Sequence, residues 1–235
     1  MSGYYSVWTR LVQFFNTAYS SMIFYRGKDF YLKREGDDLV SYTHNNQEYS
    51  RLDVKTGKSN NWYSTVLCNR IIEKLKGKKN ATVCMLGGAG GAMSYELLTY
   101  LPNVKVTTVD IDAESIKLLN EVILKKFGRR SEGVAADAKA FINRMKPGSF
   151  DVIVIDIFIE HNVPPFVMTK AFTKACLRAL KPEGSLLTNI ISDSSDKKYG
   201  DLLLSLGLEV FTIRQGEGGL VNLLYEVVKH ASSGQ

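Results

Sequence analysis

The chain has 235 residues, of which 45% are hydrophobic and 23% charged, a composition typical of a folded domain with a substantial core. This composition excludes a disordered chain, a collagen-like polymer and a disulfide-stabilised miniprotein. The net charge is +6, and the three cysteines and three histidines lie far apart in the sequence. We therefore expect no disulfide framework and no metal site, and a reduced, cytoplasmic setting.

The N-terminal segment between Tyr4 and Tyr25 carries aromatic and aliphatic side chains at helical spacing. Polar residues recur through it and Arg10 interrupts it, so we expect neither a signal peptide nor a membrane span. The pattern predicts an amphipathic helix that packs on the protein or on a second subunit. The residues that follow change character and predict a small antiparallel β-meander. Its expected strands are 29–34, 39–44 and 48–54, and with the helix they make a first unit over residues 1–61.

A second domain is expected over residues 62–235, because strand and helix patterns alternate from Ala81 onward. This alternation predicts a doubly wound α/β sheet. The Gly218-Gly219 pair leaves no room for a crossover helix between the last two strands, so the seventh strand should be antiparallel. The expected strands are 81–87, 104–110, 132–136, 151–156, 184–191, 208–214 and 222–228. The expected helices are 62–76, 91–101, 113–126, 138–145, 168–180 and 197–205.

A glycine cluster, Gly87-Gly88-Ala89-Gly90-Gly91, follows the first strand of this sheet. Glycines here allow a sharp turn and the close approach of a ligand to the backbone. Asp110 ends the next strand about 20 residues later, the offset at which a carboxylate binds ribose hydroxyls. Met93 stands where a dinucleotide fingerprint needs a small residue, and no phosphate-binding Gly-Lys-Ser/Thr follows. The pattern therefore favours a nucleoside without phosphates.

Two further aspartates end strands at the same edge of the sheet. Asp137 is placed to bind an adenine amino group, although it could instead cap the helix that follows it. Asp156 could orient or deprotonate an incoming amine, and we predict it to be the catalytic residue. The loop after it contains Glu160 and a stiff Pro164-Pro165 pair, which we assign to the acceptor pocket.

The chain resembles the spermidine synthase-like branch of the S-adenosylmethionine-dependent transferases. The resemblance is carried by the glycine turn, Val109-Asp110-Ile111-Asp112, Ala136-Asp137-Ala138, the 150–156 strand and Leu180-Lys181-Pro182-Glu183-Gly184. It implies a Rossmann-like, seven-stranded methyltransferase-type sheet and a homodimer. It also implies S-adenosylmethionine, or its decarboxylated form, held by the glycine turn and the residue pairs Asp110-Ile111 and Asp137-Ala138, with Tyr63 at the substrate.

Three departures from the aminopropyltransferases of that branch bear on the reaction. Ala89 stands in place of an acidic residue in the glycine turn. Asp156 matches the first aspartate of their Asp-x-x-Asp-Pro motif, but the second aspartate of that motif is missing here. Tyr63-Ser64-Thr65 replaces a Tyr-Gln/His-Glu motif. Because these acidic groups would bind polyamine ammonium ions, we predict methyl transfer to an unidentified small acceptor. Aminopropyl transfer to a polyamine and a non-catalytic interaction role are the alternatives.

The positive charges of the chain gather in two clusters, at 74–79 and 125–130. Each follows a predicted helix, where cations are favoured by the helix dipole. In the expected fold both lie at the sheet edge opposite the ligand-binding edge. No aromatic and basic pattern accompanies them, so we expect no nucleic-acid partner.

Overall fold

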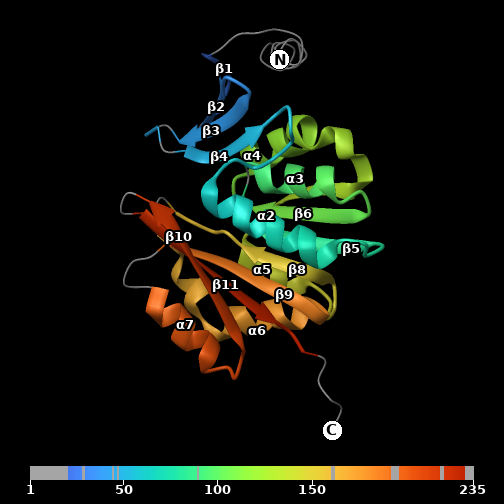
Figure 1. The fold of residues 1–235 in the computed structure, drawn as a ribbon, viewed down its shortest axis with the longest axis vertical. Helices are drawn as coiled ribbons and strands as arrows, with labels where there is room; N and C mark the ends of the chain where they lie inside the picture. Colours follow the sequence, from blue (N-terminus) through green and yellow to red (C-terminus); the bar gives the residue numbers. More distant parts are fainter. Residues whose placement is uncertain are drawn as a thin grey trace.

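The computed structural model describes residues 21–27, 30–43, 45–46, 48–88, 90–159, 162–191, 196–217 and 220–230. These residues form a four-stranded antiparallel sheet near the N-terminus and a seven-stranded mixed sheet flanked by helices (Figure 1). The predicted α/β class with an N-terminal meander is therefore confirmed. No helix in the described part of the chain is both long and apolar enough to cross a membrane.

The N-terminal sheet is a meander of neighbouring antiparallel strands. Its strands are β1 (Ser21–Arg26), β2 (Phe30–Glu35), β3 (Asp38–Thr43) and β4 (Glu48–Asp53). Phe30 and Leu32 of β2 are buried, whereas Arg51 of β4 forms ion pairs with Glu35, Asp38 and Glu48. One face of the meander thus packs on the core, and charge pairs hold neighbouring strands together on the other.

The prediction of a helix through Tyr25 is wrong at its C-terminal end, where Ser21–Arg26 form strand β1. Residues 1–20 lie outside the described residues. Ile23 of β1 pairs with Lys33 of β2, and the ring of Tyr25 lies 5.5 Å from that of Phe30. β-branched and aromatic residues favour a strand where a partner strand is present, and this tertiary pairing outweighs the helical spacing.

The seven-stranded sheet has the order β10-β11-β9-β8-β5-β6-β7. Neighbouring strands are parallel throughout the run β9-β8-β5-β6-β7. Strand β11 is antiparallel to both of its neighbours, β9 and β10. This arrangement confirms the predicted antiparallel last strand. The strands are β5 (Ala81–Leu86), β6 (Val104–Asp110), β7 (Ser131–Ala135), β8 (Phe150–Ile155), β9 (Leu180–Ile191), β10 (Val210–Glu217) and β11 (Leu220–Val228).

Helices connect these strands at the predicted places. One difference lies after β6, where α4 is short and continues as a wide π-type turn over Leu119–Ile123 and a 3-10 helix over Lys125–Arg130. The helical hydrogen-bonding pattern changes at Leu119 and again at Lys125, so a regular α-helix does not run through to residue 126. The helices are α2 (Trp62–Leu75), α3 (Ala92–Tyr100), α4 (Ala113–Leu118), α5 (Ala138–Arg144), α6 (Lys170–Ala179) and α7 (Asp196–Leu204).

The core consists of two apolar layers, one on each face of the large sheet. Side chains alternate along the strands, so Val83 and Met85 of β5 face the layer of α2 and α3, and Cys84 and Leu86 face that of α5 and α6. All six residues of β8 are buried, as expected for a central parallel strand. The sheet is thus a rigid base for groups at its carboxyl edge.

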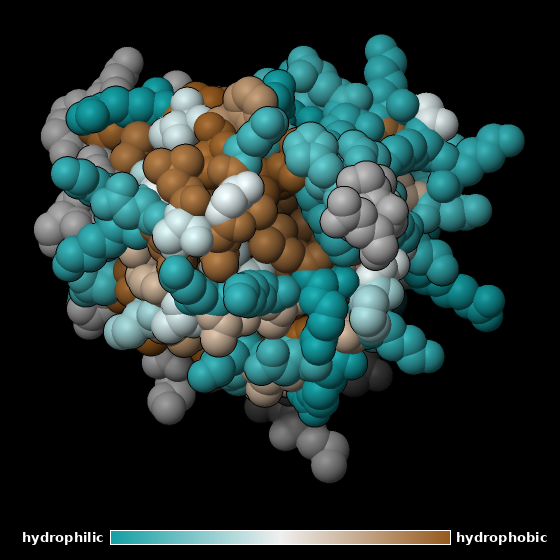
Figure 2. Space-filling model, turned by 90° about the horizontal axis from the view of Figure 1, so that it is seen from below, coloured by the Kyte–Doolittle hydropathy of each residue, from teal (hydrophilic) through white to brown (hydrophobic). Residues whose placement is uncertain are grey.

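Parts of the molecular surface are apolar. Figure 2 shows a hydrophobic area bordered by hydrophilic side chains on the face seen from below. Strand β10 forms one edge of the sheet, and its side chains Phe211 and Ile213 are exposed, as is Leu204 of α7.

Candidate active site

The glycine turn between β5 and α3 lies at the carboxyl edge of the large sheet. Gly87 has φ +89°, and a Cβ there would lie 2.1 Å from the carbonyl oxygen of Asp156. Glycine is therefore required at this position by the close approach of the ends of β5 and β8. Gly88 has φ +93°, but a Cβ there would meet no atom within 4 Å. Of these two glycines, Gly88 is the one that faces open space where a ligand could approach.

Gly90, later in the turn, is packed against the meander. A Cβ on Gly90 would lie 2.3 Å from the hydroxyl oxygen of Ser50 in β4. The hydroxyls of Ser50 and Ser41 lie 3.1 Å apart. Gly90 thus allows the N-terminal sheet to close over the turn. Ala89 lies outside the described residues.

Asp110 lies at the end of β6, and its carboxylate accepts the backbone N–H of Asp112 at 3.0 Å. Asp112 caps α4 by accepting the N–H of Glu114 at 2.9 Å, so the helix-cap role falls to Asp112. Ile111, between them, is 77% exposed. An exposed aliphatic side chain beside a strand-end carboxylate fits a nucleoside, because it presents an apolar face to a planar base.

Asp137 lies beside Asp110 at this edge, since Asp110 pairs with Ala135 at the end of β7. Asp137 is exposed and caps α5, accepting the N–H of Ala140 at 2.7 Å. Ala138 is buried in the first turn of that helix. The helix-cap role of Asp137 is therefore present in the structure, and its contact with an adenine stays a prediction.

Asp156 follows β8 directly and is buried beneath the glycine turn. Its two carboxylate oxygens have different partners. One accepts the side-chain amide of Asn189 at 2.9 Å, and the other accepts the hydroxyl of Tyr63 at 3.4 Å. Burial raises the pKa of Asp156 to about 6, although the two hydrogen bonds act in the opposite direction. A carboxyl group with this pKa can take up and release a proton near neutral pH.

Two buried asparagines support this carboxylate. The amide oxygen of Asn189 in β9 accepts the side-chain N–H of Asn222 in β11 at 2.7 Å. The second bond fixes which end of the Asn189 amide points at Asp156. Sequence reasoning missed both asparagines, because each lies inside an apolar strand and pairs with a residue distant in sequence.

Tyr63 lies in the first turn of α2 and places its hydroxyl beside Asp156. Burial raises the pKa of Tyr63 well above its usual value, and the charge of Asp156 adds to this effect. The phenol therefore stays protonated and donates to the carboxylate. The structure thus brings together Asp156 and Tyr63, which were predicted separately.

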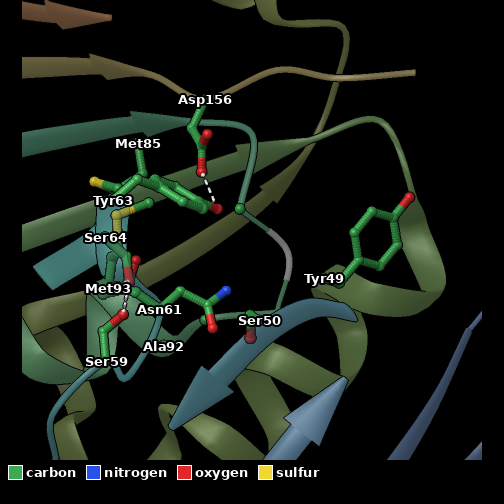
Figure 3. A pocket seen from close by; sticks show the side chains of 13 residues that line it. Tyr49, Ser50, Ser59, Asn61, Tyr63, Ser64, Met85, Ala92, Met93 and Asp156 are labelled. Carbon is green, nitrogen blue, oxygen red and sulfur yellow. Dashed lines mark hydrogen bonds between the residues drawn. The ribbon is translucent and has the colours of Figure 1, made fainter. Parts of the chain in front are cut away.

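A small pocket, partly open to solvent, lies in front of this pair. Figure 3 shows the Tyr63–Asp156 hydrogen bond on one side, with Asn61, Ser59 and Ser64 across the pocket from Asp156. Strand β4, α2, α3 and the glycine turn all contribute to the wall. The lining residues are Tyr49, Ser50, Ser59, Asn61, Tyr63, Ser64, Met85, Gly88, Gly91, Ala92, Met93, Ser94 and Asp156.

The other predicted site residues lie elsewhere. Pro164 is buried at the start of a 3-10 helix over Pro165–Met168 and does not line this pocket. Glu160 is outside the described residues. Within the part of the chain that the structure describes, no group of three or more His, Cys, Asp or Glu side chains could hold a metal ion.

Comparisons with known proteins agree with this architecture. The model of the spermine/spermidine synthase domain matches residues 64–197, more than half of the chain. A polyamine aminopropyltransferase of Prochlorococcus marinus is 26% identical over 164 residues, which make up 67% of this chain and 57% of that protein. The chain spans about half the length of the curated relatives it matches.

Solved structures show the same fold. A probable spermidine synthase from Corynebacterium glutamicum superposes with a TM-score of 0.73 at 21% identity, covering 90% of this chain and 81% of that one. A spermidine synthase in complex with the transition state analogue AdoDATO gives a TM-score of 0.59 at 15% identity, covering 89% and 72%. At these identities the likeness establishes the fold alone.

Proposed function

Because the chain belongs to the spermine/spermidine synthase domain family, we propose that it transfers the aminopropyl group of decarboxylated S-adenosylmethionine to a small amine. The observation that carries this proposal is the buried carboxylate of Asp156, held by Tyr63 and Asn189 at the wall of a pocket beside the glycine turn. An amine acceptor must lose a proton during transfer, and a carboxylate with a pKa of about 6 is a suitable base.

The reaction forms one bond and breaks another. The acceptor nitrogen attacks the carbon bonded to the sulfonium sulfur, and the electron pair of the broken C–S bond passes to sulfur. A neutral thioether nucleoside leaves, and Asp156 takes the proton that the new secondary amine loses. The hydroxyl of Tyr63 donates to Asp156 before transfer and holds the carboxylate toward the pocket. The site supplies mainly alignment and a proton acceptor.

Residues at the edge of the sheet fit the nucleoside part of the donor. Gly88 leaves the backbone of the turn open, and the exposed Ile111 offers an apolar surface to the base. Asp110 directly precedes Ile111 and ends strand β6 at the same edge of the sheet. We assign to Asp110 the ribose hydroxyls, since a carboxylate at this position can accept two hydrogen bonds.

Methyl transfer, which the sequence departures favoured, has no support from the relatives. The curated relatives are named polyamine aminopropyltransferases, and for this reason we propose transfer of an aminopropyl group rather than a methyl group. Methyl transfer remains the competing outcome of the test below.

The test incubates the purified chain with decarboxylated or carboxylated S-adenosylmethionine and a panel of primary amines, and identifies products by mass spectrometry. We expect amine products that gain an aminopropyl group from the decarboxylated donor, and no methylated products. Methylated products from the carboxylated donor alone would overturn the proposal. Binding of neither donor, measured by isothermal titration calorimetry, would point instead to a non-catalytic role.

A further inference from the structure

A second carboxyl group, that of Glu96, lies behind the wall of the pocket and has no part in the transfer described above. Glu96 belongs to α3, the helix that follows the glycine turn, and is 2% exposed. One of its carboxylate oxygens accepts the backbone N–H of Ser59 at 2.7 Å. Burial of a carboxyl group costs free energy, and this burial raises the pKa of Glu96. The hydrogen bond to Ser59 therefore indicates what the fold gains from a carboxyl group at this position.

The segment that Glu96 holds is the short connector between the meander and α2, residues 59–61. On one side, Ser59 forms an isolated antiparallel bridge with Leu52 of β4. Glu96 also faces α2 itself, because burial and then the Glu96 carboxylate raise the pKa of the Cys68 thiol. One carboxyl group thus joins the connector, α2 and the helix that begins at the glycine turn.

Hydrogen bonds extend this anchoring from Ser59 into the first turn of α2. The Ser59 and Ser64 hydroxyls are bonded to each other. The Thr65 hydroxyl lies within hydrogen-bond distance of the carbonyl oxygens of Ser59, at 3.1 Å, and Asn61, at 3.0 Å. Asn61 stands at the N-cap position but makes no side-chain cap hydrogen bond to the helix. The start of α2 is therefore fixed by its bonds to the connector rather than by a side-chain cap at Asn61.

Tyr63 lies in this first turn, so its position depends on the connector. Its hydroxyl donates to Asp156 at 3.4 Å, which is longer than a usual O–H···O hydrogen bond and is easily broken by a small shift of the helix. The side chain of Asn61 is a hydrogen-bond partner of the same hydroxyl. Figure 3 shows Asn61, Ser59 and Ser64 on the side of the pocket opposite Asp156, with Tyr63 reaching from this group to the carboxylate.

We propose that Glu96 is a positioning residue for the transfer: it anchors Ser59, and through the connector it sets the Tyr63 hydroxyl against Asp156. This inference rests on the proposed function and adds to it a residue that does not line the pocket. The oxygen that accepts the Ser59 N–H, rather than the negative charge, carries the role. Glu96→Gln keeps such an oxygen, whereas Glu96→Leu leaves a buried N–H without its acceptor.

The experiment measures kcat and KM of both variants with decarboxylated S-adenosylmethionine and 1,4-diaminobutane. We expect E96L to lower kcat by about tenfold and E96Q to stay within about twofold of the wild type. In a Tyr63→Phe background E96L should have little further effect on kcat, because both changes act on one contact. Arg70→Gln is the control. It removes a 2.6 Å ion pair between α2 and Glu226 of β11, away from the connector, and should leave kcat unchanged.

A second measurement needs no substrate. Carbon-13 NMR follows the titration of the Asp156 carboxyl group, whose resonance is assigned with the Asp156→Asn variant. E96L should raise the pKa of Asp156, because it weakens the Tyr63 hydrogen bond that favours the ionised form. E96Q and Arg70→Gln should leave this pKa in place. Should E96L fail to fold, Ser64→Ala breaks the next link to the connector and should raise the same pKa.

The two measurements separate the inference from the proposed function. The expected shifts in the pKa of Asp156 support the inference even where no transfer occurs, and the absence of transfer then counts against the proposed function alone. The inference is overturned by a loss of kcat in E96Q as large as that in E96L, or by an effect of E96L that persists undiminished in the Tyr63→Phe background. A pKa of Asp156 that E96L, or Ser64→Ala in its place, leaves unmoved also overturns it.

Discussion

The side-chain amide of Asn189 donates a 2.9 Å hydrogen bond to the carboxylate of Asp156, and it does so from the interior of a β-sheet. Asn189 is 1% exposed, and its own orientation is fixed by the amide of Asn222. A buried amide pair contributes less to packing than two apolar side chains of the same volume. Its structural consequence here is a carboxylate held in one orientation at the floor of the pocket.

The first prediction concerns the pH dependence of transfer. Asp156 acts as a base only when ionised, so kcat/KM should fall on the acid side with a midpoint near pH 6. Asn189→Leu removes a hydrogen bond to the charged form, which raises the pKa of Asp156 and moves the midpoint upward. A pH profile of kcat/KM measures the shift. Thr188→Val changes a buried polar residue that pairs with Tyr199 and should leave the midpoint in place.

A second prediction separates activity from stability at Asp156. Asp156→Asn should lower kcat by at least about 10³-fold, because no proton acceptor remains. The folded-state pKa of Asp156 is raised, so the wild type loses stability as pH rises from about 4 to about 6, the window in which the unfolded chain ionises first.

Above pH 6 the Asp156→Asn variant should therefore be more stable than the wild type, by about 1 to 3 kcal/mol. Urea unfolding at pH 8 and pH 4.5 measures the difference, which should shrink at the lower pH. A variant that is less stable than the wild type at pH 8 would contradict the conclusion that burial destabilises the ionised form of Asp156.

The third prediction tests the phenol. Tyr63→Phe removes the hydroxyl that donates to Asp156 and should lower kcat/KM by about 10- to 100-fold while the chain stays folded. Tyr100→Phe is the matched control, because its hydroxyl donates to the backbone of Thr56 on the surface. Equal activities of the two variants would show that the Tyr63 hydroxyl has no part in transfer.

A fourth prediction distinguishes two neighbouring glycines. Gly87→Ala places a methyl group 2.1 Å from the Asp156 carbonyl oxygen and should destabilise the fold by at least about 3 kcal/mol. Gly88→Ala meets no atom, so it carries only the strain of its positive φ, about 1 to 2 kcal/mol. Thermal unfolding and nucleoside titration check this pair. Gly88→Ala should remain folded and bind 5′-methylthioadenosine more weakly, whereas equal stabilities would contradict the packing role of Gly87.

The large sheet could be predicted from the sequence because its signals are local. Apolar runs such as 152–155, glycine turns and strand-end aspartates each mark an element within a few residues. The boundary that failed, at Ser21–Arg26, depends on a partner strand that helical spacing does not reveal. The early end of α4 comes from the change to a π-type turn at Leu119, which the spacing of apolar residues does not reveal.

In the candidate site, too, the residues marked by local sequence signals were predicted and those that depend on long-range pairing were not. Asp156 and Tyr63 were predicted from strand-end position and family resemblance, and the structure places them in contact. Asn189 and Asn222 could not be found this way, because their role arises from pairing between β9 and β11. Gly90 was predicted as a ligand contact, which stays a prediction; the structure adds that the Ser50 hydroxyl of the meander leaves no room for a side chain there. Long-range packing determines these roles.

The most direct test of the account is the identity of the transferred group. The purified chain is given equal concentrations of decarboxylated and carboxylated S-adenosylmethionine together with a primary amine, and the products are resolved by mass spectrometry. We expect an amine extended by an aminopropyl group together with 5′-methylthioadenosine, and the loss of both products in the Asp156→Asn variant. A methylated amine together with S-adenosylhomocysteine, or turnover unaffected by Asp156→Asn, would contradict it.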